Sequence, residues 1–162
     1  MKQAIFSIIA VLFCLGQQAF SDVIDKADYN DLSVSIKYYN RTMYYPGNRE
    51  SNPVLVHISI KNNSTETKRF KLADDRMFSI DFDVITIKNQ TLPQSENLIK
   101  KRTTNRTVYF REIALDNGEE YSFTENLKDY IDITDPAVYY ADLKFYPELY
   151  KSKYISLDSN RL

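Results

Sequence analysis

The strongest constraint on the fold is an alternation of apolar and polar side chains along several short segments, most regular over residues 54–61 and 139–146. In the second segment we expect one set to point inward and one outward: Tyr139, Ala141, Leu143 and Phe145 against Tyr140, Asp142, Lys144 and Tyr146. A β-strand turns successive side chains to opposite faces, whereas an α-helix would mix the two sets. Both segments therefore predict half-buried antiparallel strands.

The same alternation, less regular, predicts further short strands. They cover residues 32–39, 69–73, 78–87, 108–115, 121–124 and 153–157, with turn residues such as Gly118 and Pro136 between them. In the strand over 78–87, Phe78 should point inward and Ser79 outward. With no amphipathic helix longer than about one turn, this pattern predicts an all-β antiparallel β-sandwich of about seven to eight strands. An up-and-down barrel is the alternative.

One internal segment lacks any sustained period. Residues 88–105 are polar, contain Pro93 and carry a short basic run, Lys100-Lys101-Arg102. We expect a long mobile connection here, with room for an edge strand.

The first 21 residues have the pattern of a secretory signal peptide. Lys2 supplies the positive end, an apolar run follows, and Ala19-Phe20-Ser21 resembles a cleavage site. We therefore predict a signal peptide over 1–21, a single domain over 22–162, and export to the periplasm or the outside of the cell. The apolar run is short for a transmembrane helix, so no membrane span is expected after cleavage.

Composition excludes several classes of function. The chain carries 21 basic and 22 acidic side chains, a balance that does not suit a nucleic-acid-binding protein. Cleavage would remove Cys14, the single cysteine, and leave His57 as the single histidine. His57 should face solvent on a strand, so catalytic triads and zinc sites lack residues. We predict no enzyme activity, no cofactor and no metal.

Carboxylates are the remaining candidates for chemistry. One group is Asp74, Asp75, Asp81 and Asp83, and the other is Asp129, Asp132 and Asp135. Neither matches a calcium loop of fixed spacing, so solvated acidic faces that keep sheet edges soluble explain them better. A calcium site at the second group is the alternative.

Exposed tyrosines and the basic run are the candidate partner-binding residues. Tyrosine offers a large contact area at a small entropic cost, and the chain has 13 tyrosines and no tryptophan. The candidates are Tyr44, Tyr45, Tyr140, Tyr146, Tyr150, Lys100, Lys101 and Arg102. Tyrosines that pack across strands, and a solvated basic loop, are the alternatives.

Four stretches carry a family resemblance: VSIKYYN, PVLVHISIKNNS, GEEYSFTENLKDY and DPAVYYADLKFYP. Their order is similar to that of exported bacterial immunoglobulin-like modules, including BsuPI-type proteinase-inhibitor-like domains and spirochaete envelope proteins. The resemblance implies an immunoglobulin-like β-sandwich. It also implies a tyrosine corner, in which the hydroxyl of Tyr139 bonds back to the link before it. No inhibitory loop can be matched.

We therefore predict a non-catalytic exported module of the bacterial envelope that binds another protein of the envelope or outside the cell. A proteinase inhibitor that uses residues 88–105 as an extended loop is one alternative. A periplasmic chaperone or envelope-assembly subunit is another.

Overall fold

The structure, a computed structural model, describes residues 29–39, 53–135, 137–148 and 155–162. Within these ranges it contains eight β-strands, all paired antiparallel, and one α-helix. The all-β sandwich predicted from the sequence is confirmed. The predicted signal peptide, Pro136 and the candidate residues Tyr44, Tyr45 and Tyr150 lie outside the described residues.

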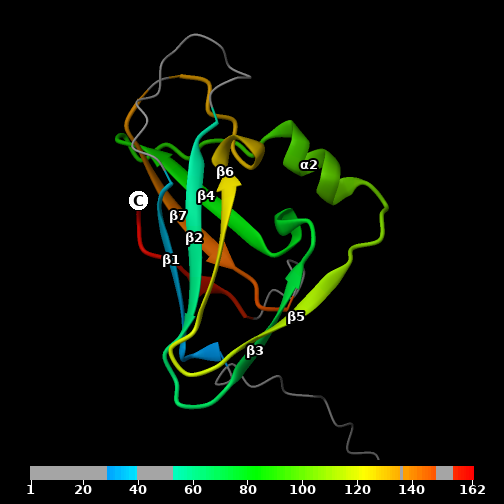
Figure 1. The fold of residues 1–162 in the computed structure, drawn as a ribbon. Coiled ribbons are helices and arrows are strands. Elements are labelled where there is room, and N and C mark those ends of the chain that lie inside the picture. Colours follow the sequence, from blue (N-terminus) through cyan, green and yellow to red (C-terminus); the bar gives the residue numbers. More distant parts are fainter. Residues whose placement is uncertain (1–28, 40–52, 136, 149–154) are drawn as a thin grey trace, which may run out of the picture.

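The first layer is a sheet of three strands, β1 (Leu32–Tyr38), β2 (Leu55–Asn62) and β6 (Glu120–Asn126), with β2 in the centre (Figure 1). Val56, Ile58 and Ile60 of β2 are fully buried, as their alternation predicted. Every second side chain of β1 and β6 also points toward the core, so this sheet has one apolar face and one solvent-exposed face.

The second layer contains β4 (Ile80–Thr86), β7 (Tyr139–Phe145) and β8 (Leu157–Asp158), with β7 in the centre. The predicted inward set of β7 is buried or half-buried, and the outward set is more exposed at Tyr140. The strand order in the two layers, β1-β2-β6 and β4-β7-β8, places strands side by side that are far apart in the sequence. An up-and-down barrel, in which sequence neighbours pair throughout, is thereby ruled out.

A second pair of strands, β3 (Lys68–Ala73) and β5 (Phe110–Leu115), continues the β2–β6 ribbon beyond a bend. At the bend Asn62 receives the backbone N–H of Gly118 and donates its own N–H to Glu119, which closes the β2–β6 ladder. The ribbon then turns away from the first sheet (Figure 1). The backbone N–H of Lys71 in β3 bonds to the carbonyl of Pro147, just after β7, at 2.7 Å. The ribbon that continues the first layer is thus also bonded to the end of the second.

The side chain of Asn62 fixes this bend. It is fully buried, and its amide donates to the carbonyls of Glu66, Leu115 and Asp116, at 2.7, 2.9 and 3.3 Å. Its carbonyl oxygen accepts from both the N–H and the hydroxyl of Ser64. A buried polar group is tolerated when its hydrogen bonds are made, and here Asn62 ties the turns on both sides of the ribbon together.

Aromatic side chains from different elements meet between the layers. Phe70 of β3 packs edge-on against Phe145 of β7, with ring centroids 5.3 Å apart, and Phe82 packs edge-on against Tyr130 at 5.1 Å. Edge-to-face contacts of this kind are favoured by the ring quadrupoles. The core therefore spans both layers and includes the β3–β5 ribbon.

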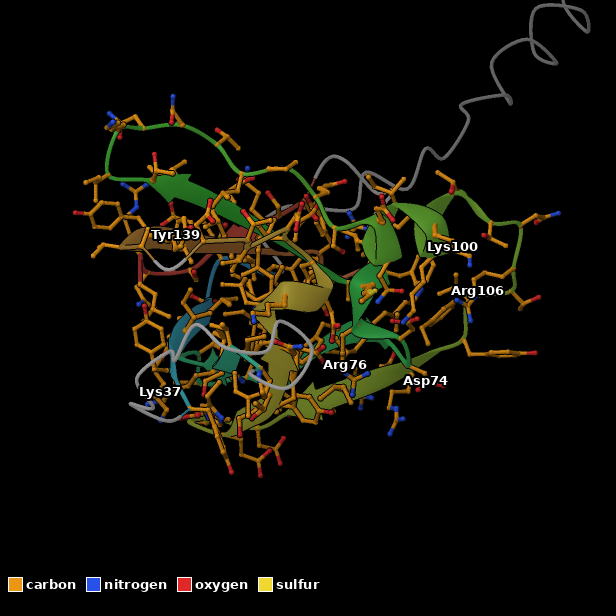
Figure 2. The ribbon with its side chains drawn as sticks, turned by 90° about the horizontal axis from the view of Figure 1, so that it is seen from above. Lys37, Asp74, Arg76, Lys100, Arg106 and Tyr139 are labelled. Carbon is orange, nitrogen blue, oxygen red and sulfur yellow. The ribbon has the colours of Figure 1, made fainter. Side chains whose placement is uncertain are left out.

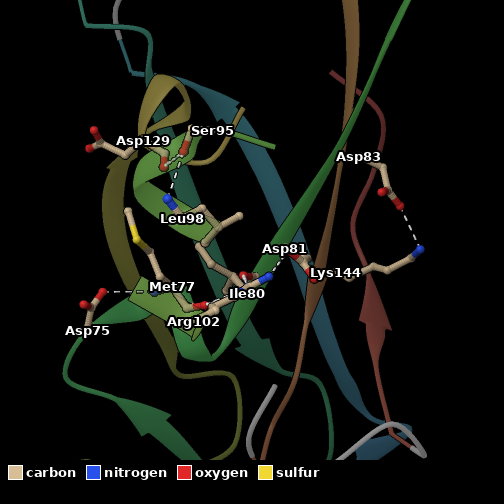
Figure 3. Close-up of polar contacts among 10 residues, drawn as sticks. All are labelled: Asp75, Met77, Ile80, Asp81, Asp83, Ser95, Leu98, Arg102, Asp129 and Lys144. Carbon is tan, nitrogen blue, oxygen red and sulfur yellow. Dashed lines mark hydrogen bonds and ion pairs between the residues drawn. The ribbon is translucent and has the colours of Figure 1, made fainter. Parts of the chain in front are cut away.

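The prediction of a long mobile connection over residues 88–105 is wrong for most of that segment. Residues 90–92 bond back to β4, and an α-helix, α2 (Glu96–Thr103), follows. Ser95 caps the helix by accepting from the N–H of Leu98, which is itself buried (Figure 3). A helix this short has too few apolar residues to show a period, so its stability comes from the cap and from packing.

The start of β4 also differs from the prediction. Phe78 belongs to a 3-10 helix (Arg76–Phe78), and Ser79 is fully buried although it was predicted to point outward. The hydroxyl of Ser79 accepts the backbone N–H of Ala73 at 2.8 Å. A serine that satisfies a buried backbone group looks, in the sequence, like an outward polar residue of a strand.

Candidate interaction surface

Large apolar side chains are exposed at two places on the described surface. Five of them lie at the strand ends where β1 and β4 finish and β7 begins; we call this set the aromatic end: Tyr38, Tyr39, Ile87, Val138 and Tyr140. The other three lie on α2 and at the start of β5: Ile99, Tyr109 and Phe110. Contiguous exposed apolar surface commonly marks an interaction site, whereas single exposed residues do not.

Strand register gathers part of the aromatic end. Tyr140 of β7 lies opposite Ile85 of β4. Ile87 lies in the turn that follows β4, and Val138 lies directly before β7. Val138 and Ile87 are each 65% exposed, although neither lies within a regular strand. The pairing of β4 with β7 therefore brings exposed apolar residues from the end of one strand and the start of the other to the same end of the sandwich.

The last described residues bring β1 to the same place. The N–H of Leu162 bonds to the carbonyl of Ala141, and the reverse bond is also formed. Two residues earlier, the side chain of Asn160 bonds to the backbone of Ile36 in β1. The end of β1, with Tyr38 and Tyr39, therefore lies near the start of β7 (Figure 1).

Tyr139 fixes the entry of the chain into β7. Its hydroxyl donates to the carbonyl oxygen of Asp135 at 2.6 Å, as the tyrosine corner predicted. Because successive side chains of a strand point to opposite faces, anchoring Tyr139 inward holds Tyr140 outward. This contact orients the aromatic end.

Charged residues on the outer face of β7 are paired with one another. Arg161 contacts the carboxylate of Asp142 through two nitrogens, at 2.5 to 3.0 Å, and Lys144 contacts Asp83 at 2.7 Å. The hydrogen bond that Arg161 donates to Asp142 raises the pKa of Arg161. These ion pairs form a polar border beside an apolar centre, the arrangement found in protein interfaces.

The basic run is divided by the fold. Lys100 is exposed, and Lys101 pairs with Asp75 at 2.9 Å. Arg102 points inward: it donates to the carbonyls of Met77 and Ile80 and to the carboxylate of Asp81 (Figure 3). Its side chain is only 6% exposed, so its role is to attach α2 to β4. Figure 2 shows Lys100 on the side of the molecule opposite Tyr139.

The acidic residues of the first group are each paired with a cation. Asp74 contacts Arg111, and Asp75, Asp81 and Asp83 contact Lys101, Arg102 and Lys144. Among the described residues, no group of three histidine, cysteine, aspartate or glutamate side chains is placed to hold a metal ion. His57 is half-buried; its ring lies 6.5 Å from that of Tyr39 and within 3.4 Å of the Ser59 hydroxyl.

Comparison with known protein families decides the class of protein. The family model of the N-terminal domain of flagellar collar protein C matches residues 33–162. The chain belongs to this family. None of the curated proteins matches it. Flagellar collar protein C is by its name a structural component of the flagellum, which agrees with the predicted non-catalytic envelope component. It also agrees with the resemblance to spirochaete envelope proteins, whereas nothing supports the immunoglobulin-like or the BsuPI-type part.

Within this collar family domain, sequence reasoning found one residue of the aromatic end, Tyr140, and missed the other four. The alternation predicts Tyr38 and Tyr39 only as the end of the strand over 32–39, and Ile87 only as the end of the strand over 78–87. The available signal was their position at the ends of alternating segments, where a strand leaves the sheet and its side chains lose their neighbours. Tyr146 is half-buried.

Two further features bear on the predicted functions. Within residues 88–105, one part pairs with β4 and another forms α2. The proteinase-inhibitor alternative required an extended loop there, and the structure does not contain one over these residues. No helix in the described ranges is long and apolar enough to cross a membrane.

Proposed function

We propose that this chain is an exported, non-catalytic interaction module of the flagellar collar, located in the periplasm, and that it binds a neighbouring protein of the assembly through the aromatic end. The observation that supports this proposal is the collection of five exposed apolar side chains at one end of the sandwich. Membership of the collar protein C family supplies the setting.

The aromatic end has the anatomy of a binding surface. Tyrosines such as Tyr38 and Tyr140 add contact area without a large entropic cost, and they rank among the residues that dominate binding energy. The strands and the Tyr139 contact hold the surface in place before binding. A preorganised surface loses little conformational entropy when a partner binds.

The test is a pair of variants in cells that assemble a collar. Tyr38→Ser together with Tyr140→Ser should remove the aromatic contact without unfolding the domain, because both side chains are exposed. We expect loss of this protein from purified motors, and loss of collar density in images of intact cells. Tyr109→Ser is the matched control: it removes a tyrosine that is 70% exposed but lies on the other surface.

A photo-crosslinker in place of Tyr140 gives a direct readout. It should attach to one protein of the collar, whereas the same group in place of Tyr109 should not. Normal collar assembly by the double variant, with its thermal unfolding unchanged, would contradict the proposal. If the protein crosslinks during assembly but is absent from finished collars, it acts as an assembly chaperone instead.

A further inference from the structure

Most sheet edges of the described fold are occupied. On β1, the N–H and carbonyl of Ile36 bond to the side chain of Asn160. On β4, the carbonyl of Val84 accepts the N–H of Leu92. On β3, the N–H of Lys71 bonds to Pro147. Natural proteins cover edges in this way because a free edge offers unpaired backbone groups to any extended chain.

The outer edge of β6 has no such cover within the described residues. Hydrogen bonds from Leu127 to Val54 and from Asn62 to Glu119 fix which residues face β2. Because hydrogen-bonded pairs alternate along an antiparallel ladder, Tyr121 and Phe123 direct their backbone groups toward β2. Ser122 and Thr124 direct theirs away. No strand pairs with β6 on that side in the described structure.

Side chains along β6 suit an added strand. Tyr121 and Phe123 are half-buried on the inner face, where Arg76 donates to the hydroxyl of Tyr121 and stacks over the Phe123 ring at 5.3 Å. Ser122 and Thr124 are exposed on the outer face. A neighbouring strand would place its inner side chains against the two rings and its outer side chains against the two hydroxyls.

The charge around this edge favours a basic partner. Exposed acidic residues occur at the start of β6 and in the turn before it, and no described ion pair involves them: Asp116, Glu119 and Glu120. Lys61 lies opposite Glu120 in the register, again without an ion pair. The other uncovered edge, on β5, differs because its charged residues Arg111 and Glu112 are already paired with Asp74 and Arg69.

We propose that the outer edge of β6 binds an extended, basic segment of a partner protein as an additional β-strand. Backbone hydrogen bonds to Ser122 and Thr124 would supply affinity, and alternating apolar and basic side chains would supply specificity. This edge lies on the opposite side of the first sheet from β1. The proposal therefore stands independently of the aromatic end.

The test uses the chain labelled with nitrogen-15 and a synthetic peptide of about eight residues that alternates lysine and valine. We expect saturable binding with the largest amide shifts at Ser122 and Thr124. A peptide that alternates glutamate and valine should bind at least about tenfold more weakly. Thr124→Pro should weaken binding of the lysine peptide about tenfold, because it removes one outward N–H.

Ala114→Pro is the matched control, since it removes an outward N–H from the free edge of β5 and should leave affinity unchanged. Ser122→Lys provides a second variant in case Thr124→Pro unfolds; it adds a repulsive charge to an exposed position and should also weaken binding. Failure of the lysine peptide to bind, equal binding of both peptides, or full binding by Ser122→Lys would overturn the proposal.

Discussion

Asn160 uses its side-chain amide as a substitute for a neighbouring strand along Ile36. Its oxygen accepts the N–H of Ile36 at 2.8 Å, and its nitrogen donates to the carbonyl of the same residue at 3.1 Å. One side chain thus forms hydrogen bonds with both the N–H and the carbonyl that Ile36, 124 positions away in the sequence, directs away from the sheet.

Replacing Asn160 with alanine should lower the free energy of unfolding by about 1–2 kcal/mol, because two partly buried hydrogen bonds are lost. Denaturant unfolding measures this change. Asn105→Ala, at an exposed position, is the control and should have no measurable effect. The Asn160 variant should also self-associate more readily through the opened β1 edge; equal stability and solubility of the two variants would contradict the assigned role.

Arg102→Ala should be among the most destabilising single changes. It leaves the carboxylate of Asp81 without its cation and two carbonyls without a donor in a poorly solvated place. Removal of one partner from a buried ion pair costs about 3–5 kcal/mol. Urea unfolding should show this loss, whereas Arg69→Ala, which breaks an exposed pair with Glu112, should cost about 0–1 kcal/mol. A small effect at Arg102 would mean that α2 is not attached through it.

Asn62→Ala should loosen the bend of the ribbon. Three carbonyls lose their donor in a buried place, and we expect a loss of about 3 kcal/mol. The neighbouring Asn63→Ala removes a single exposed hydrogen bond to Ser33 and should cost much less. Hydrogen exchange should show faster opening of Lys68 to Ala73 in the first variant alone; unchanged protection there would contradict this role.

Tyr139→Phe should keep the ring and lose the hydrogen bond to Asp135. We expect a loss of about 1 kcal/mol in the free energy of unfolding. Tyr140→Phe serves as the comparison on the exposed face. Equal stability of the two variants would show that the tyrosine corner contributes nothing.

Ionisation of Glu125 should lower the free energy of unfolding as the pH rises. Burial raises its pKa, opposed by the hydrogen bond that the Tyr130 hydroxyl donates at 3.0 Å and by Arg76. The folded protein therefore keeps the carboxyl proton at a pH where the unfolded chain has lost it. This contribution is fully present below the ordinary glutamate pKa of about 4.3 and is lost as the pH rises through the folded value.

Glu125→Gln isolates this contribution, because glutamine keeps an acceptor for Tyr130 and cannot ionise. The difference in unfolding free energy between the two proteins should favour the natural chain more at low pH and shift toward the variant as the pH rises. Burial also raises the pKa of Tyr130, so its hydroxyl keeps its proton over the same range. A difference that does not depend on pH would contradict the raised pKa.

The sequence was sufficient to locate a strand where one face of that strand is uniformly buried. Alternation located β2 and β7 because Val56, Ile58, Leu143 and Phe145 all enter one core. It failed where a few polar contacts decide the structure: the cap at Ser95 and the inward guanidinium of Arg102 hold a helix that shows no period. It also could not pair distant segments, so neither the Asn160 contact nor the gathering of Tyr38 with Tyr140 could be predicted.

The bend at Asn62 gives the sandwich a mechanical property. Because the ribbon that continues the first layer also bonds to the chain just after β7, sliding one layer over the other would require rupture of the Lys71–Pro147 backbone hydrogen bond in addition to displacement of apolar contacts. Two sheets joined only by loops would lack this resistance. The domain should therefore respond to shear as one stiff block.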